Sequence, residues 1–113
     1  MNCIFCKIAA GEIPATIVHQ DEHVVAFRDL NPQAPTHILI IPRQHIATVN
    51  ALTEADATVV GHLFLAARQL AAELGFAEDG YRLVMNTNAA AGQTVFHIHL
   101  HLLAGRNFAW PPG

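Results

Sequence analysis

Three histidines spaced two residues apart lie near the carboxyl end of the chain. His97, His99 and His101 alternate with apolar residues across the segment 95–103. Side chains alternate across a β-strand, so the three imidazoles would project from one face and the apolar side chains from the other. Imidazole titrates near neutral pH, and its neutral form can act as a nucleophile, a base or a metal ligand. The pattern predicts a chemically active strand backed by the core. The alternative is a partly exposed strand with titrating surface histidines.

Composition limits the kind of protein that carries this strand. The chain has 113 residues, of which 52% are hydrophobic and 13% are charged, which favours one compact domain over residues 1–113. A net charge of −3 with six Lys and Arg residues argues against nucleic-acid binding, which needs basic patches to neutralise phosphates. Backbone N–H groups, hydroxyls and imidazoles must then hold any phosphate, which suits a small nucleotide rather than a polymer.

The start of the chain and its cysteines indicate a cellular location. The first residues lack a basic segment followed by a long apolar run, so no signal peptide is expected. No stretch approaches the length of a transmembrane helix, so no membrane association is expected. Cys3 and Cys6 are the only cysteines and are too close together to staple a domain. We therefore expect a cytoplasmic protein.

Hydrophobic spacing and turn residues place the elements that must position the histidines. A short helix is expected at residues 3–10. A long helix should begin at a cap formed by Thr53 with Asp56 and end at Gly75. The expected strands are residues 16–20, 23–29, 36–42, 81–86 and 95–103. This order predicts an α+β fold with a five-stranded antiparallel sheet, one long helix and one short helix.

Several motifs together resemble the histidine-triad family. Residues 97–103 match its His-x-His-x-His-x-x signature, in which x is apolar. The resemblance continues in Ile4-Phe5, Glu12-Ile13-Pro14-Ala15, Phe27-Arg28-Asp29, residues 32–37, Gly92-Gln93-Thr94 and the ending Trp110-Pro111-Pro112-Gly113. It covers nearly the whole chain. The ending resembles the Hint branch rather than the diadenosine-polyphosphate hydrolase branch.

The resemblance implies a reaction at the α-phosphorus of a nucleotide. Hint proteins cleave the P–N bond of purine nucleoside 5′-phosphoramidates, which implies that His99 attacks phosphorus and forms a nucleotidyl-histidine that water hydrolyses. The resemblance implies that His101 contacts the phosphate and that His37 orients the triad by a hydrogen bond. The predicted catalytic residues are therefore His37, His97, His99 and His101. The chemistry is reasonable, because neutral imidazole needs no strong base and a second imidazole can protonate the departing amine.

The same resemblance implies a set of nucleotide contacts. Asp29 would accept hydrogen bonds from ribose hydroxyls, although it could also simply cap a turn. Thr94 and the backbone beside it would contact the phosphate, where many relatives carry Ser. The predicted nucleotide-binding residues are Ile4, Phe5, Ile8, Phe27, Arg28, Asp29, Leu30, Asn86, Gly92, Gln93, Thr94 and Trp110.

The two cysteines overlap with the triad in a second constellation. Redox and zinc sites share the Cys-x-x-Cys spacing, so the pair alone does not choose between them. Some family members bind structural zinc through such a pair, a downstream histidine and the first triad histidine. The matching residues are Cys3, Cys6, His45 and His97, a set suited to tetrahedral zinc. The alternative is two reduced structural thiols.

The resemblance also implies a homodimer. An apolar, proline-stiffened ending that carries Trp110 suits a partner surface better than solvent. Two other functions stay open. One is a dinucleoside-polyphosphate hydrolase, and the other is a nucleotide-binding regulatory protein with little turnover.

Overall fold

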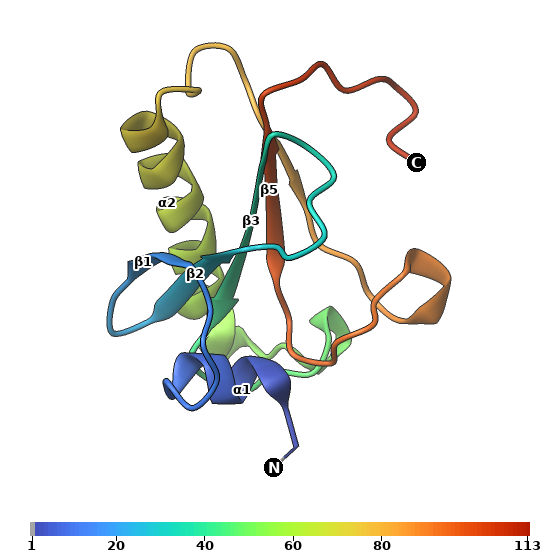
Figure 1. Cartoon of the computed structure of the whole chain (residues 1–113). Helices are drawn as coiled ribbons and strands as arrows, with labels where there is room; N and C mark the ends of the chain where they lie inside the picture. The colour runs from blue at the N-terminus through green and yellow to red at the C-terminus, as the bar shows by residue number, and fades with distance from the viewer. Residues whose placement is uncertain (1) are drawn as a thin grey trace.

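A computed structural model describes residues 2–113 and contains one five-stranded antiparallel sheet in the order β1-β2-β3-β5-β4 (Figure 1). The helices are α1 (Ile4–Ala9) and α2 (Ala57–Leu74). The strands are β1 (Ile17–Gln20), β2 (Val24–Arg28), β3 (Thr36–Pro42), β4 (Arg82–Val84) and β5 (Leu100–Ala104). Single 3-10 turns cover Val49–Ala51, Glu54–Asp56 and Ala89–Ala91. The predicted α+β class, the five strands and the two helices are confirmed.

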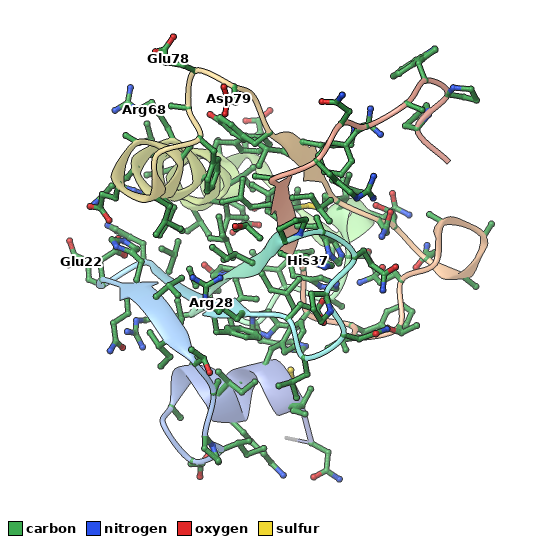
Figure 2. All side chains as sticks on the ribbon, turned by 45° about the horizontal axis from the view of Figure 1, so that its top comes forward. Glu22, Arg28, His37, Arg68, Glu78 and Asp79 are labelled. Carbon is green, nitrogen blue, oxygen red and sulfur yellow. The ribbon has the colours of Figure 1, made fainter. Side chains whose placement is uncertain are left out.

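The central strands are buried on both faces, which explains their nearly continuous apolar sequences. Residues facing α2 include Val24, Ala26, Ile38 and Ile40, whereas Val25, Phe27, Leu39 and Ile41 face the α1 side. The sheet therefore separates a large core under α2 from a smaller one under α1. In Figure 2 the charged groups of Glu22, Arg68, Glu78 and Asp79 lie at the periphery, whereas His37 lies inside.

The long helix ends at the predicted residue, whereas the predicted capping box lies one 3-10 turn before its first residue. Asp56 accepts a hydrogen bond from the Thr53 N–H at 2.9 Å, and the two residues form a capping box around a 3-10 turn that leads into α2. Gly75 ends the helix in the left-handed conformation, with φ of 87°. None of the helices in residues 2–113 is long and apolar enough to cross a membrane.

The predicted strand 95–103 is wrong over its first half. β5 begins at Leu100, which pairs with Ile40 of β3. Continuing this register would place Ile98 opposite Pro42, which has no N–H to donate to a ladder. The Ile98 N–H instead donates to the Ile46 carbonyl at 2.8 Å. Residues 95–99 thus leave the sheet and turn beneath α1.

The side chains of residues 97–99 still alternate between the two sides, although these residues lie outside the sheet. Ile98 is buried in the core on the α2 side with the apolar residues of β5. The His97 and His99 rings pack on the other side against Phe5 of α1, with ring centroids 5.9 Å and 5.1 Å away. The prediction that the histidines share one side of the segment is confirmed, even though the first two precede the strand.

Candidate active site

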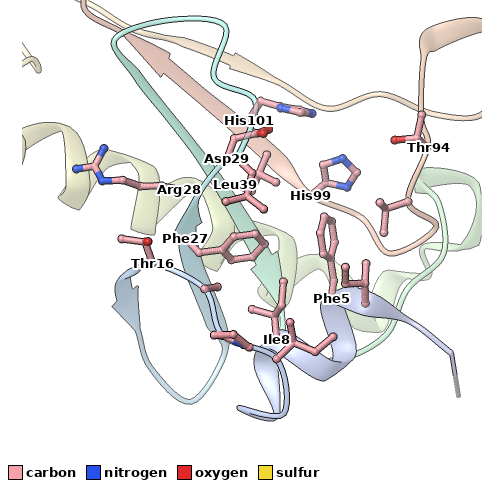
Figure 3. A pocket seen from close by; sticks show the side chains of 16 residues that line it. Phe5, Ile8, Thr16, Phe27, Arg28, Asp29, Leu39, Thr94, His99 and His101 are labelled. Carbon is pink, nitrogen blue, oxygen red and sulfur yellow. The ribbon is translucent and has the colours of Figure 1, made fainter.

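A cavity of about 320 Å³ opens between α1, the end of β2 and the histidine segment (Figure 3). Its apolar part includes Phe5, Ile8 and Phe27, and its polar end carries His99 and His101 (Figure 3). The lining residues are Ile4, Phe5, Ile8, Ile13, Pro14, Ala15, Thr16, Phe27, Arg28, Asp29, Leu30, Leu39, Thr94, Val95, His99 and His101. Such a site suits a ligand with a flat apolar part and an anionic end.

A backbone carbonyl determines which ring nitrogen of His99 carries the proton. The Nδ1 atom of His99 lies 2.9 Å from the carbonyl oxygen of His97. A carbonyl only accepts hydrogen bonds, so Nδ1 carries the proton and donates it. The other nitrogen, Nε2, then holds the lone pair. His99 lies at the cavity wall with its ring edge-on to Phe5, so this nitrogen is the candidate nucleophile.

A backbone amide determines the tautomers of two further histidines. The Gln33 N–H donates to His37 Nδ1 at 3.1 Å, so the proton of His37 is on Nε2. This Nε2–H donates to His101 Nδ1 at 2.9 Å. The remaining nitrogen of His101 therefore carries a proton that it can offer to a bound group. The Asp29 carboxylate lies 3.5 Å from His37 Nε2 and favours the same arrangement.

Both of these histidines are neutral at pH 7 in the ligand-free protein. Burial, with the neighbouring His99 and His37, lowers the pKa of His101 to about 4, against a smaller opposing effect of Asp29. Burial also lowers the pKa of His37, and Asp29 again opposes the change. Neutral rings have one donor and one acceptor nitrogen each, which the chain from Gln33 to His101 requires.

A second cluster has the geometry of a metal site. Ligand atoms of Cys3, Cys6, His45 and His97 all lie within 4.8 Å of one another. His97 Nδ1 is 3.3 Å from Cys3 Sγ, 3.5 Å from Cys6 Sγ and 3.3 Å from His45 Nδ1. Neighbouring ligand atoms around tetrahedral zinc lie about 3.3–3.8 Å apart, given Zn–N and Zn–S bonds of about 2.0 Å and 2.3 Å.

The tautomer of His97 is also the one that a metal site requires. Its Nε2 atom lies 2.8 Å from the Pro42 carbonyl oxygen and must be the donor, so the lone pair on Nδ1 points into the cluster. A metal-bound imidazole commonly donates its other N–H to a backbone carbonyl in this way. The four residues therefore fit a structural zinc ion.

A similar group of Asp29, His37 and His101 has suitably close ligand atoms but the wrong polarity. The amide of Gln33 occupies the lone pair of His37 Nδ1, so His37 Nε2 carries a proton and has no lone pair for a metal. This group is arranged to hold a proton rather than a cation.

Most of the predicted nucleotide contacts line the cavity. They are Ile4, Phe5, Ile8, Phe27, Arg28, Asp29, Leu30 and Thr94. Gln93 is buried, accepts from the Asn88 N–H, and donates to the carbonyls of Ala47 and Val95. Its side chain thus holds the loop that presents Thr94. Gly92 ends the preceding 3-10 turn with φ of 90°.

Like Gly92 and Gln93, the predicted contacts Asn86 and Trp110 do not line this cavity. Asn86 lines a smaller cavity on the other side of His101. Trp110 is 84% exposed and does not line either cavity. Residues that the sequence prediction missed include Thr16, Leu39 and Val95. Only strand register reveals that Leu39, unlike its neighbours in β3, faces the cavity.

The comparisons with known proteins show the family of the chain. A model of the HIT domain matches residues 10–108, so the chain belongs to the HIT family. It is 55% identical over 103 residues to the purine nucleoside phosphoramidase of Escherichia coli, covering 91% of this chain and 87% of that protein. It is 53% identical over 112 residues to an uncharacterized HIT-like protein of Synechocystis, covering 99% and 97% of the two chains.

A solved structure gives the same result. The HIT family hydrolase from Legionella pneumophila superposes with a TM-score of 0.97 at 56% identity, covering 99% of this chain and 100% of that one. The predicted family is thus confirmed, and the matches support a hydrolase.

The low pKa of His101 predicts how stability depends on pH. Between its usual pKa of 6.5 and its folded value of about 4, the unfolded chain binds a proton that the folded protein does not. The contribution of neutral His101 to the free energy of unfolding is fully present above pH 6.5 and is lost as the pH falls towards 4. In urea unfolding at several pH values, His101→Gln should show a shallower loss of unfolding free energy over this range. Above pH 7 the unfolding free energies of wild type and of His101→Gln should change with pH in parallel. If they stayed parallel down to pH 4, the low pKa assigned to His101 would be wrong.

Proposed function

We propose that the protein hydrolyses the P–N bond of purine nucleoside 5′-phosphoramidates, with His99 as the nucleophile. The observation that carries the proposal is the lone pair on His99 Nε2, which the His97 carbonyl directs away from the backbone at the polar end of the cavity. The 55% identical relative named purine nucleoside phosphoramidase supports this substrate class.

The lining of the cavity suggests how a substrate binds. The base would lie in the apolar part beside Phe5 and Phe27, whose rings meet edge to face at 5.5 Å. The ribose hydroxyls would donate to Asp29, which the Asn31 N–H already orients by a 2.8 Å hydrogen bond to Oδ1. The phosphate would then lie among His99, His101 and the Thr94 hydroxyl.

The reaction begins when His99 Nε2 forms a bond to phosphorus and the P–N bond breaks. The departing nitrogen must gain a proton. A bound phosphate anion raises the pKa of the nearby His101, so in the complex its Nδ1 takes up a proton in place of the hydrogen bond from His37, and its Nε2 proton is transferred to the amine. Neutral His101 then accepts a proton from the water that hydrolyses the nucleotidyl-histidine, which restores both rings.

We further propose that Cys3, Cys6, His45 and His97 hold a structural zinc ion. Burial and the neighbouring Cys3 raise the pKa of the Cys6 thiol, and a cation bound beside it would favour its ionised form. Bound zinc would supply a rigid tetrahedral crosslink between α1 and the histidine segment. His97 presents the carbonyl that orients His99, so this crosslink would steady the nucleophile while taking no part in the chemistry.

The homodimer implied by the sequence also belongs to this proposal. The outer face of α2 exposes Phe64 and Leu65, at 46% and 50%, and Trp110 is exposed on the carboxyl-terminal segment. Exposed apolar side chains of this size are typical of a subunit interface.

His99→Ala should reduce phosphoramidate hydrolysis by about 10⁴-fold or more, because no other group supplies the attacking lone pair. His101→Gln should cost about 10²–10⁴-fold through the lost proton transfer. Wild-type protein quenched during turnover in alkaline denaturant, which preserves a P–N bond to histidine, should carry one nucleotidyl group that peptide mass spectrometry locates. His62→Ala, on α2, serves as the control with full activity.

An adduct on another residue, or near-normal activity of His99→Ala, would contradict the mechanism. A dinucleoside polyphosphate that is cleaved faster than the simple adenosine 5′-phosphoramidate would favour the alternative hydrolase.

Zinc is tested by metal content together with stability. Protein purified without chelators should contain one zinc per chain, and the Cys3→Ser, Cys6→Ser double variant should lose both the metal and thermal stability. His45→Ala should lose zinc as well, whereas His62→Ala should keep it. The zinc site is wrong if the native protein holds far less than one zinc per chain, or if the double variant melts at the wild-type temperature with its metal unchanged.

A further inference from the structure

The cluster formed by Cys3, Cys6, His45 and His97 is open on one side. A cavity of about 350 Å³ reaches it, and both Cys3 and His45 belong to the cavity wall. The rest of the wall is formed by Asn2, Ile4, Thr94, Val95 and Phe96. Cys6 is itself partly exposed. A small solute can therefore come into contact with the cysteines of this cluster without unfolding the protein.

The two sulfur atoms are close enough to be joined. Cys3 is the N-cap of α1, and Cys6 is the third residue of the helix. Their Sγ atoms are at most 4.8 Å apart, and the Cys6 N–H donates to Cys3 Sγ at 3.4 Å. Residues three apart on a helix have Cβ atoms about 5–6 Å apart, whereas a disulfide needs about 3.5–4.5 Å. A small tightening of the first turn of α1 would thus allow the bond.

A disulfide and a zinc ion exclude each other at this site. Zinc is bound by thiolate sulfur, and the sulfurs of a disulfide carry no such charge. The Cys-x-x-Cys spacing is shared by zinc sites and redox sites. In this protein the two interpretations of the spacing describe two states of one pair of residues, one reduced and metal-bound and the other oxidised and metal-free.

His97 connects this pair to the proposed nucleophile. Its Nδ1 atom lies 3.3 Å from Cys3 Sγ and 3.5 Å from Cys6 Sγ, and its carbonyl oxygen accepts the hydrogen bond from His99 Nδ1. The cavity beside the cysteines also shares Ile4, Thr94 and Val95 with the nucleotide cavity. A change at the cysteines therefore acts on a residue that directly orients His99.

We propose that Cys3 and Cys6 form a peroxide-sensitive modification site, whose oxidation to a disulfide releases zinc and slows hydrolysis by loosening His97. This inference goes beyond the proposed function and rests on it and on the proposed zinc site. The oxidant is hydrogen peroxide, which is small enough for the cavity.

The oxidation takes place in two balanced steps. The thiolate of one cysteine attacks an oxygen of hydrogen peroxide, the O–O bond breaks, and a sulfenic acid and hydroxide are formed. The second thiolate attacks the sulfenic sulfur, forms the S–S bond and expels a second hydroxide. The two sulfurs lose two electrons to the peroxide, and two protons from solvent convert both hydroxides to water. Only His45 and His97 are then left as ligands, fewer than the four of a structural zinc site.

The test treats the zinc-loaded protein with hydrogen peroxide and measures three quantities. A coloured chelator should report one zinc released per chain, and the intact mass should fall by two hydrogen atoms as the disulfide forms. Hydrolysis of adenosine 5′-phosphoramidate should fall by about tenfold or more, the effect typical of losing a group that supports a site from behind. A thiol reductant added with zinc should reverse all three changes.

Three variants control for other effects of the oxidant. Cys3→Ser and Cys6→Ser should each stop at a sulfenic acid, which dimedone traps, and form no intramolecular disulfide. The double variant should lose no activity on treatment with peroxide. Oxidation of Met1 or Met85 would add oxygen to the mass instead of removing hydrogen, so it is distinguished in the same spectrum.

The outcomes separate this inference from the proposals on which it rests. If the untreated protein does not hydrolyse the phosphoramidate, the proposed function is wrong, while mass and zinc release still test the disulfide. If the untreated protein holds no zinc, the zinc proposal is wrong. The modification site is wrong if peroxide leaves both thiols and the zinc in place, or if hydrolysis is unchanged when the disulfide is complete.

Discussion

The hydrogen bond from His99 to the backbone of His97 determines what the site can do. An imidazole has two nitrogens of opposite character when neutral, and a partner that can only accept decides which of them keeps the lone pair. The His97 carbonyl performs this role for His99, and the Pro42 carbonyl performs it for His97. The Gln33 amide, which can only donate, leaves the proton of His37 on Nε2 and, through His37, the proton of His101 on Nε2 as well. Three of these four histidines therefore receive their tautomers directly from backbone groups, and His101 receives its tautomer through His37.

The fold explains how these backbone groups come to lie beside the rings. Pro42 ends the β3–β5 ladder, so the segment before β5 leaves the sheet and is free to turn beneath α1. That turn brings His97 to the two cysteines and leaves its carbonyl in contact with His99. If the segment continued as a regular strand, its carbonyls would bond to a neighbouring strand instead of to imidazoles. The proposed zinc site would fasten this irregular segment at the residue that orients the nucleophile.

The sequence predicted the fold and most of the candidate site, because both depend on local patterns. Apolar spacing and capping residues predicted the capping box at Thr53 that leads into α2 and the end of α2 at Gly75, and the family resemblance led to the residues that surround the cavity. Three-dimensional contacts decided the rest. No spacing rule shows that Gln93 turns inward to hold the Thr94 loop, or that Arg82 and Arg106, which are 24 positions apart, flank one aromatic ring. The early start predicted for β5 failed because the pattern of alternating side chains persists in an extended segment that lacks a pairing partner.

The proposed chemistry depends most on which histidine nitrogens carry protons, which ¹⁵N nuclear magnetic resonance of the ligand-free protein at pH 7 measures directly. Long-range couplings from the ring carbons' protons identify which nitrogen of each imidazole is protonated. The account predicts the proton of His99 on Nδ1 and the protons of His37 and His101 on Nε2. A His99 ring protonated on Nε2 would leave no lone pair facing the substrate and would contradict the central claim.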